Sequence, residues 1–293
     1  MMLPLGRGRL RARHTLLMIS AKGGVGKSTL TVNLAAALTA RGQRVGIFDA
    51  DLHGPNIPAL LGVRQKRDLL GERNPLAMLP VEARPDALDL RPLAPLERYG
   101  IRVMSLALLV GDTQAITPEA KETGRLTNLL LQRVDWGETD VLLIDMPPGT
   151  GEPLNTLIDQ GLIDGALLIA TRERLAHLDN GRLISLLRKR GVPLLGIVEN
   201  MTHIICPKCG EVIELYPQPA AAQEVYEGID VLAGVPFHPE MIRQPGAGAP
   251  LPLRTPDAPA AAPLLVLADR VLAKLAQRQP SAQPPESDCE DCP

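Results

Sequence analysis

The sequence predicts an α/β fold, a doubly wound and mostly parallel sheet with helices on both faces. Two observations predict it. Short apolar runs alternate along the chain with stretches of helical length, and several of these runs are apolar at every position. Continuously apolar strands are typical of a parallel sheet that is covered on both faces. Strand–helix–strand repetition then implies right-handed crossovers between the strands.

The expected elements form one P-loop ATPase domain over residues 15–278. The expected strands are 15–20, 44–49, 141–145, 166–170, 194–199 and 231–236. The expected helices are 28–40, 124–134, 175–190, 221–227 and 264–277, and Gly42 should end the first of them. Residues 64–100 are rich in Pro and Arg, which predicts an insertion with a hairpin of 88–93 and 101–106. Outside the domain lie a basic N-terminal extension (1–14) and an acidic tail (279–293).

The composition argues against several classes of function. The chain has 293 residues, 45% of them hydrophobic, so it can bury a full core. Its net charge of −2 provides no overall basic field that would attract nucleic acid or anionic lipid. Aromatic residues make up 2% of the chain, too few for a surface that stacks single-stranded bases. We therefore expect no nucleic-acid partner and no membrane partner.

The compartment is expected to be the cytoplasm. The first apolar run, residues 15–19, is too short for a signal peptide or a membrane span, and it leads directly into a glycine-rich loop. Four cysteines form two C-x-x-C pairs. In a reducing compartment such pairs indicate metal or redox chemistry rather than structural disulfides.

Residues 21–29, Ala-Lys-Gly-Gly-Val-Gly-Lys-Ser-Thr, predict a phosphate-binding loop for ATP. Gly23, Gly24 and Gly26 allow backbone N–H groups to approach phosphate oxygens at the positive end of a helix dipole. The helix that follows should begin near Lys27, whose ammonium is expected to reach the β- and γ-phosphates.

The other residues of this loop have separate expected roles. Ser28 should ligate Mg²⁺ and Thr29 should lie near the α-phosphate, with Val25 contributing backbone. Ala21 replaces the first glycine of the strict motif, and Lys22 is an additional lysine. The loop is therefore of the deviant type.

Carboxylates end two further predicted strands. Asp145 ends the strand 141–145, an arrangement that places an Asp beside hydrated Mg²⁺. The turn after it contains Gly149, whose amide is expected to sense a γ-phosphate. Asp49 and Asp51 follow the strand 44–49 with a spacing that lets them share one face. We expect Asp51 to orient the attacking water.

These segments together resemble the Mrp/ApbC family of iron–sulfur cluster carrier ATPases, within the wider MinD/ParA class. The resemblance covers most of residues 15–278. The segments that carry it are 21–29, 49–56, 144–151, 196–201 and 206–210. The Asp-Ala-Asp…Gly-Pro and Met-Pro-Pro-Gly-Thr-Gly segments are more specific than the phosphate loop, which the whole class shares.

The resemblance implies a slow ATPase that works as a homodimer and transfers a [4Fe-4S] cluster to apo iron–sulfur client proteins. It implies that Lys22 crosses to the nucleotide of the partner subunit and that Asn200 reads adenine. It also implies that Cys206 and Cys209 from two subunits hold one bridging cluster. The ligand count agrees, because a four-iron cluster needs four thiolates and one C-x-x-C pair supplies two.

Zinc is the alternative metal at this pair, in the predicted loop 201–220. Taken alone, the motif C-P-x-C-G is more often half of a structural zinc site. The fold predicted for the rest of the chain favours the iron–sulfur cluster instead. Lys208 between the cysteines favours thiolate for either metal. His203 is a less favoured additional ligand.

The second pair, Cys289 and Cys292, lies in a Pro-rich acidic tail that is too polar to fold alone. The neighbouring carboxylates disfavour a dianionic ligand set. Three interpretations stay open: incidental thiols, a transient cluster relay, and a four-cysteine zinc site closed with Cys206 and Cys209.

The chain departs from the family pattern in several places. Arg172-Glu173 stands where Pro-Gln is usual, and Pro217-Gln218-Pro219 stands where a Gly-rich stretch is common. Residues 113–121 lack a Trp-Arg-Gly-Pro segment, and the accessory N-terminal domain of many members is not seen. These departures leave the phosphate chemistry intact, but they bear on dimer contacts near the cysteines and on the choice of client.

Two other functions are weighed against the carrier. A positioning ATPase of the MinD or ParA kind would need a membrane helix or a basic DNA face. The apolar stripe of residues 264–277 is instead expected to pack on the sheet. A zinc-stabilised NTPase without a cluster role would differ from the carrier in its metal content. The sequence does not name the client.

Overall fold

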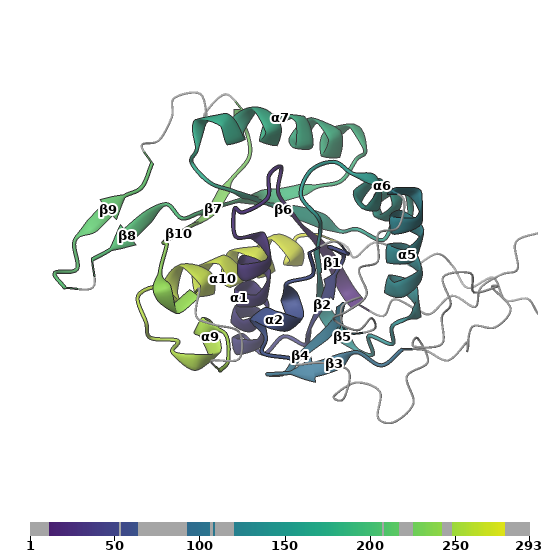
Figure 1. Ribbon diagram of the computed structural model, residues 1–293, viewed down its shortest axis with the longest axis horizontal. Helices are drawn as coiled ribbons and strands as arrows, with labels where there is room; N and C mark the ends of the chain where they lie inside the picture. The colour runs from purple at the N-terminus through teal and green to yellow at the C-terminus, as the bar shows by residue number, and fades with distance from the viewer. Residues whose placement is uncertain are drawn as a thin grey trace, which may run out of the picture.

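One eight-stranded sheet organises the chain, with strand order β10-β7-β6-β1-β5-β2-β4-β3. The computed structural model describes residues 12–52, 54–63, 93–105, 108, 120–206, 208–216, 225–241 and 248–278. The pairings in the sheet are parallel except that of β3 with β4. Helices cover both faces (Figure 1). The predicted fold class is confirmed.

The predicted strands are present with small shifts at their ends. The strands of the sheet are β1 (Ala12–Ile19), β2 (Val45–Asp49), β3 (Leu96–Arg98), β4 (Ile101–Ser105), β5 (Thr139–Asp145), β6 (Gly165–Ala170), β7 (Leu194–Asn200) and β10 (Val231–Val235). A separate antiparallel hairpin consists of β8 (His203–Ile205) and β9 (Val212–Glu214). Because β1 begins at Ala12, the sheet includes the last residues of the expected N-terminal extension of residues 1–14.

The helices are α1 (Lys27–Ala40), α2 (Ile57–Leu60), α5 (Ala120–Arg133), α6 (Glu152–Asp159), α7 (Arg174–Lys189), α9 (Leu251–Arg254) and α10 (Ala262–Ala276), with a 3₁₀ turn η2 (Pro239–Met241). Gly42 has φ 77° and its N–H donates to the Thr39 carbonyl, so it ends α1 as predicted. Of the expected helix 221–227, residues up to 224 lie outside the described part, and residues 226–228 form a turn.

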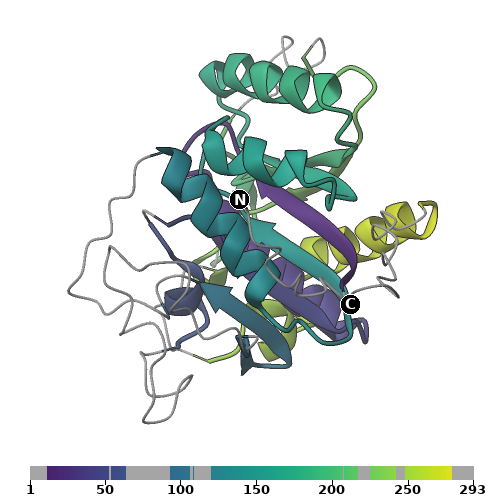
Figure 2. The same cartoon turned by 90° about the vertical axis from the view of Figure 1, so that its right-hand side faces the viewer.

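Alternating residues of β1 divide the core between the two faces of the sheet. Leu16 and Met18 belong to the cluster packed under α1 and α10, whereas Leu17 and Ile19 belong to the cluster under α5, α6 and α7. Figure 2 shows the two groups of helices on opposite sides of the sheet. All four side chains are at most 1% exposed, as the continuously apolar pattern predicts for a covered parallel strand.

The hairpin in the insertion differs from the prediction. The strand expected at 101–106 is β4, but it pairs with β3 and, in parallel, with β2. The reason is the turn Tyr99-Gly100, where both residues have positive φ (56° and 74°) between the paired residues Arg98 and Ile101. Such a two-residue turn joins adjacent antiparallel strands directly. Most of the expected partner, 88–93, lies outside the described residues.

Strand order decides where a ligand site can form. β1 lies between β5 and β6, so the connections after β1 and β6 diverge to opposite sides of the sheet. Ligands of open α/β sheets bind at the carboxyl ends of the strands, at such a switch point. The ends of β1, β2, β5 and β7 carry the phosphate loop, Asp49, Asp145 and Asn200. Among the described residues, no helix has the length and apolar character needed to cross a membrane.

Replacing Gly196 in β7 by Ala is expected to lower the free energy of unfolding by ~1–3 kcal/mol, because the site is overpacked. A Cβ there would lie 2.5 Å from Leu232 Cγ and 2.8 Å from the Asp230 carbonyl oxygen. Gly181→Ala in α7 is the matched control, since its Cβ would meet Val225 Cγ1 at 3.5 Å, an ordinary contact. The control should leave stability unchanged or raise it by ~1 kcal/mol. Urea unfolding compares the two variants, and equal effects would contradict the tight packing of β7 on β10.

Candidate functional site

The loop between β1 and α1 has the backbone of a phosphate cradle. Gly24 and Gly26 adopt φ of 80° and 85°, in the left-handed region that side chains disfavour. Gly26 is the N-cap of α1, and no side chain caps it. The N–H groups of the first helical turn therefore remain free of a side-chain cap at the positive end of the helix dipole, where anions bind.

A buried carboxylate, Asp145, gathers the start of α1. Lys27 Nζ lies 2.8 Å from Asp145 Oδ1, and the Ser28 hydroxyl donates to Oδ2 at 2.6 Å. Lys27 is 7% exposed and Asp145 is fully buried. The structure thus brings together three residues that the sequence predicts for phosphate and Mg²⁺ binding. Hydroxyl and carboxylate oxygens are the hard ligands that Mg²⁺ prefers, so the donor set fits that ion.

Thr31 belongs to the same cluster, although the sequence reasoning missed it. Its hydroxyl oxygen lies 2.8 Å from Asp145 Oδ1 and 3.0 Å from the Lys27 carbonyl oxygen, so the single hydroxyl proton is shared between these two acceptors. The available signal was its spacing, since a residue four positions after Lys27 lies on the same face of the helix. Asp145 therefore contacts three side chains of α1.

Asp49 lies beside Asp145 at the ends of two neighbouring strands. The two residues are register partners in the parallel pair β2–β5. Asp49 is fully buried and accepts hydrogen bonds from the Asp51 N–H (3.2 Å), the Ile57 N–H (3.3 Å) and the Ser105 hydroxyl (3.1 Å). Burial, and then the charge of Asp145, raise the pKa of Asp49 to about 8, against the opposing effect of these bonds. Ser105, at the end of β4, was not predicted.

Asp51 lies past the end of β2 and is partly exposed. Its Oδ1 accepts the Gly54 N–H at 3.1 Å, and its own N–H is the one bound to Asp49. The loop that carries Asp51 is therefore held at both ends by Asp49, through the amides of Asp51 and Ile57. The predicted role of Asp51 in orienting water stays a prediction.

Two predicted residues have partners within their own chain in this structure. Lys22 Nζ lies 3.7 Å from Asp179 Oδ2 on α7, and both side chains are about a third exposed, so the pair is a weak surface contact. The Gly149 N–H donates to the Ser20 carbonyl at 2.8 Å. Sensing of a γ-phosphate by this amide stays a prediction, and it requires that this bond open.

Asn200, at the end of β7, contacts the phosphate loop itself. Its side chain is 4% exposed, and Nδ2 donates to the Val25 carbonyl at 2.8 Å. A Cβ at Gly26 would lie 2.3 Å from this Nδ2, so only glycine fits there. The donor atoms of Asn200 are thus directed at the loop, and its predicted contact with adenine is untested.

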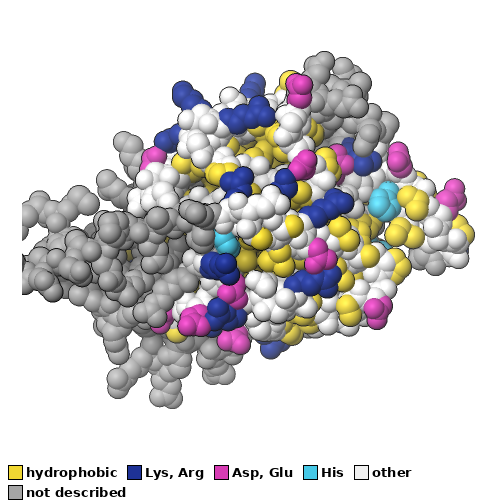
Figure 3. Space-filling view, turned by 180° about the vertical axis from the view of Figure 1, so that it is seen from behind, with side chains coloured by type: hydrophobic (Ala, Val, Ile, Leu, Met, Phe, Trp, Pro, Cys, Tyr) yellow, Lys and Arg dark blue, Asp and Glu magenta, His cyan; other side chains and the backbone are white. Residues whose placement is uncertain are grey.

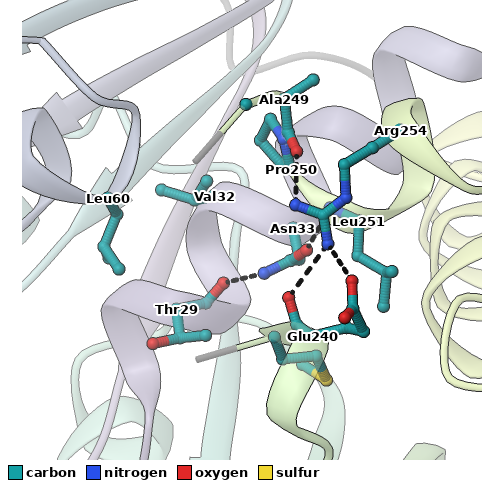
Figure 4. A pocket seen from close by; sticks show the side chains of 11 residues that line it. Thr29, Val32, Asn33, Leu60, Glu240, Ala249, Pro250, Leu251 and Arg254 are labelled. Carbon is teal, nitrogen blue, oxygen red and sulfur yellow. Dashed lines mark hydrogen bonds and ion pairs between the residues drawn. The ribbon is translucent and has the colours of Figure 1, made fainter. Parts of the chain in front are cut away.

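A small polar hollow opens beside the first turns of α1 (Figure 4). Asn33 Nδ2 donates to the Thr29 carbonyl at 2.8 Å, and Asn33 Oδ1 accepts the Leu251 N–H at 3.2 Å. Across the hollow, Arg254 Nη2 donates to Glu240 Oε2 at 2.6 Å. Asn33 therefore holds α9 against α1 directly after the phosphate loop.

The hairpin β8–β9 holds the first C-x-x-C pair and projects from the main body (Figure 1). The backbone N–H of Cys209, that of Lys208 and the Cys209 side chain hydrogen-bond to the Cys206 thiol and lower its pKa. The Cys206 carbonyl accepts the Gly210 N–H at 2.9 Å, and Gly210 has φ 76°. Both cysteines are free, and the lowered pKa of Cys206 favours the thiolate form that either metal requires.

Within the described residues, the two thiols are not part of a larger preformed ligand group. There, no group of three or more His, Cys, Asp and Glu side chains is arranged to hold a metal ion. His203 Nδ1 hydrogen-bonds with the Thr202 hydroxyl at 2.8 Å, and His203 does not form such a group with the two thiols, so its role as an additional ligand stays a prediction. Cys289 and Cys292 lie outside the described residues.

Apolar side chains are exposed next to the two thiols. The exposed large hydrophobic residues of this region are Val212, Ile213, Leu215, Tyr216 and Phe237. Figure 3 shows hydrophobic side chains on the projecting hairpin, at the right of that view. Contiguous exposed apolar surface is typical of a contact with another molecule.

The departure at Arg172 has a structural explanation. Arg172 Nε lies 2.8 Å from Glu199 Oε2, and the two side chains are 16% and 10% exposed. This ion pair joins the second residue after β6 to the residue that precedes Asn200 in β7. It stabilises the end of β7 by a charged pair at a position where the family pattern has proline. The departures at 217–219 and at most of 113–121 lie outside the described residues.

Comparison with known proteins agrees with these observations. The family model described as ParA, NUBPL iron-transfer P-loop NTPase, matches residues 11–272. An iron–sulfur cluster carrier protein of Pyrococcus abyssi is 34% identical over 90% of this chain and 87% of its own length. The iron–sulfur cluster transfer protein NUBPL of Dictyostelium discoideum is 33% identical over 85% of this chain and 72% of its own.

Solved structures show the same fold. A nucleotide-binding protein of Archaeoglobus fulgidus in complex with ADP, in which cobalt was found, has a TM-score of 0.65 and 29% identity, covering 85% of this chain and 90% of its own. The septum site-determining protein MinD of Pyrococcus horikoshii, complexed with Mg-ADP, has a TM-score of 0.61 and 24% identity, covering 90% and 97%. The likeness to MinD supports the fold alone.

The raised pKa of Asp49 predicts that the folded protein loses stability as pH rises. An unfolded Asp titrates near 3.8, whereas folded Asp49 titrates at about 8. Between these values the folded chain retains a proton that the unfolded chain has released, so the free energy of unfolding falls with rising pH. Asp49→Asn cannot titrate and should flatten this slope. Urea unfolding of both proteins across that range measures it, and an unchanged slope in the variant would assign the pH dependence to other groups.

Proposed function

The chain belongs to the NUBPL iron-transfer P-loop NTPase family, and from that premise we propose its full cycle. It binds ATP with Mg²⁺, hydrolyses it slowly, and carries a [4Fe-4S] cluster held between two copies of itself for transfer to apo iron–sulfur client proteins. The observation that carries this proposal is that the end of strand β7 lies between the two sites. β7 ends in Asn200 against the phosphate loop, and the next strand leads to Cys206 and Cys209.

The nucleotide half of the proposal rests on the cluster around Asp145. The loop amides and Lys27 would bind the β- and γ-phosphates, and Ser28 with Asp145 would hold the magnesium ion. Mg²⁺ would supply positive charge against the phosphate oxygens. Lys27 Nζ is paired with Asp145 Oδ1 at 2.8 Å. To bind a phosphate, the Lys27 ammonium would therefore leave Asp145 or contact the carboxylate and the phosphate together.

The cluster half rests on the ligand count. One hairpin offers two adjacent thiols, and in the described part of the chain no third ligand stands beside them. Two copies related by two-fold symmetry would supply the four thiolates of one [4Fe-4S] cluster. The exposed apolar residues of β9 and its flanks support a contact between molecules at this place. Zinc shared in the same way is the competing occupant.

Replacing Asp51 by Asn is expected to slow ATP hydrolysis about 100-fold while leaving ATP affinity nearly unchanged, because its proposed role is to orient water. Steady-state ATPase rates and nucleotide titration measure the two effects. Asp269→Asn is the control, since Asp269 lies 53% exposed on α10 in a pair with Arg41. An unchanged rate in Asp51→Asn would remove Asp51 from the reaction.

Iron analysis tests the cluster directly. After anaerobic reconstitution we expect about four iron and four sulfide per dimer, with a visible chromophore. Cys206→Ala or Cys209→Ala should each abolish it, because each removes two of the four symmetric ligands. Cys289→Ala and Cys292→Ala are the matched controls and should retain iron.

Two outcomes would contradict the bridging cluster. Zinc without iron, retained by a colourless protein, would assign a structural zinc site. Loss of metal in the tail variants as complete as in Cys206→Ala would mean that both C-x-x-C pairs meet at one site.

A further inference from the structure

Two residues separate Asn200, which contacts the phosphate loop, from the β8–β9 hairpin that holds the cysteines. β7 ends at Asn200, whose side chain is bound to the loop, and β8 begins at His203. Met201 and Thr202 lie between them. The hairpin therefore begins immediately after the residue that contacts the nucleotide site.

The contact with the loop is close on both sides. Asn200 Nδ2 donates to the Val25 carbonyl at 2.8 Å within a buried site. A Cβ at Gly26 would lie 2.3 Å from Asn200 Nδ2 and 3.5 Å from Met201 Cε. The amide of Asn200 therefore fills the space that a side chain at Gly26 would need, and it is bonded to the neighbouring carbonyl. Because buried, packed groups do not move independently, a rearrangement of the Val25–Gly26 backbone is expected to displace Asn200.

The contact with the hairpin is equally direct. The Thr202 N–H donates to the Val235 carbonyl at 3.0 Å, and the Thr202 carbonyl accepts the Leu215 N–H at 3.2 Å. The next residue, His203, pairs with Glu214 in the ladder that ends at Ile205, and the Cys206 N–H donates to the Glu211 carbonyl. An unbroken series of backbone bonds thus runs from Thr202 to the first thiol.

Met201 joins these two anchored segments in a strained conformation. Its φ is 56°, in the left-handed region that residues other than glycine rarely adopt. Such a conformation persists where the surrounding structure imposes it, and here Asn200 is held by the loop and Thr202 by β10. The direction in which the hairpin leaves the sheet is therefore set from both sides of Met201.

We infer that Asn200 is a positioning residue that couples the phosphate loop to the Cys206–Cys209 pair. A nucleotide that moves the Val25 carbonyl changes the placement of the hairpin, and with it the affinity of the two thiols for a bound metal. Binding of that metal then changes the affinity for the nucleotide by the same factor. This inference rests on the proposed function, since it needs both the nucleotide and the thiol site. It adds the residue through which one site acts on the other.

Cysteine reactivity measures the coupling without using turnover. The metal-free full-length chain is alkylated with iodoacetamide with and without saturating Mg-ADP. Trypsin cuts after Lys208, so mass spectrometry follows Cys206 and Cys209 in separate peptides. We expect Mg-ADP to change the Cys206 rate about fivefold, the lower end of typical coupling. Asn200→Ala should abolish this change at saturating Mg-ADP.

Asn33→Ala is the matched control. Asn33 is also buried, and its Nδ2 also donates at 2.8 Å to a carbonyl next to the phosphate loop, that of Thr29 (Figure 4). It leads to α9 rather than to the hairpin. Its variant should therefore retain the nucleotide-dependent change. Met201→Gly provides a second variant that keeps the Asn200 contact, because glycine adopts the same φ without strain; it should weaken the change at unaltered Mg-ADP affinity.

Calorimetric titration of Mg-ADP on the same samples separates the possible failures. Mg-ADP binding to the unaltered chain with no change in Cys206 reactivity overturns the coupling and leaves nucleotide binding standing. Loss of the change in Asn33→Ala as complete as in Asn200→Ala overturns the specific role of Asn200. Absence of Mg-ADP binding to the unaltered chain overturns both this inference and the proposed function.

Discussion

The nucleotide site depends on one buried charge, the carboxylate of Asp145 at the end of the central strand β5. A fully buried carboxylate without a partner destabilises a protein by several kcal/mol, roughly 3–5 when a partner is removed. Here Lys27, Ser28 and Thr31 satisfy it, and all three belong to the first turns of α1. The requirement to pair Asp145 therefore positions α1, and with it the loop whose amides are expected to bind the phosphates.

Asp49 adds a second carboxylate to the same edge of the sheet and extends the site to the next loop. Burial disfavours the charged form of Asp49, the neighbouring charge of Asp145 adds to this effect, and together they raise the pKa of Asp49. Its hydrogen bonds hold the start and the end of the loop that contains Asp51. The phosphate cradle, the site expected for Mg²⁺ and the loop expected to orient water are thus connected through two adjacent side chains.

The hairpin that follows β7 offers a different chemistry from the cluster around Asp145. Around Asp145 the donors are hard oxygens and an ammonium, suited to Mg²⁺ and phosphate, whereas the β8–β9 hairpin offers two soft thiols. Each of the two separate sites therefore presents the ligand type that its proposed metal prefers. Their connection through Asn200 gives the fold a physical means by which the state of one site alters the other.

The sequence by itself determined the parallel sheet, the phosphate loop, the two strand-ending carboxylates and the thiol pair, because each is a local pattern of a few adjacent residues. Tertiary structure alone decided which of them meet. Strand order puts Asp49 beside Asp145 and brings Ser105 to Asp49, and the bond from Asn200 to Val25 crosses 175 positions of sequence. The pairing of β4 with β3 and of Arg172 with Glu199 was equally hidden. Contacts of this kind depend on non-local packing, since no periodicity or local propensity encodes which strand ends become neighbours.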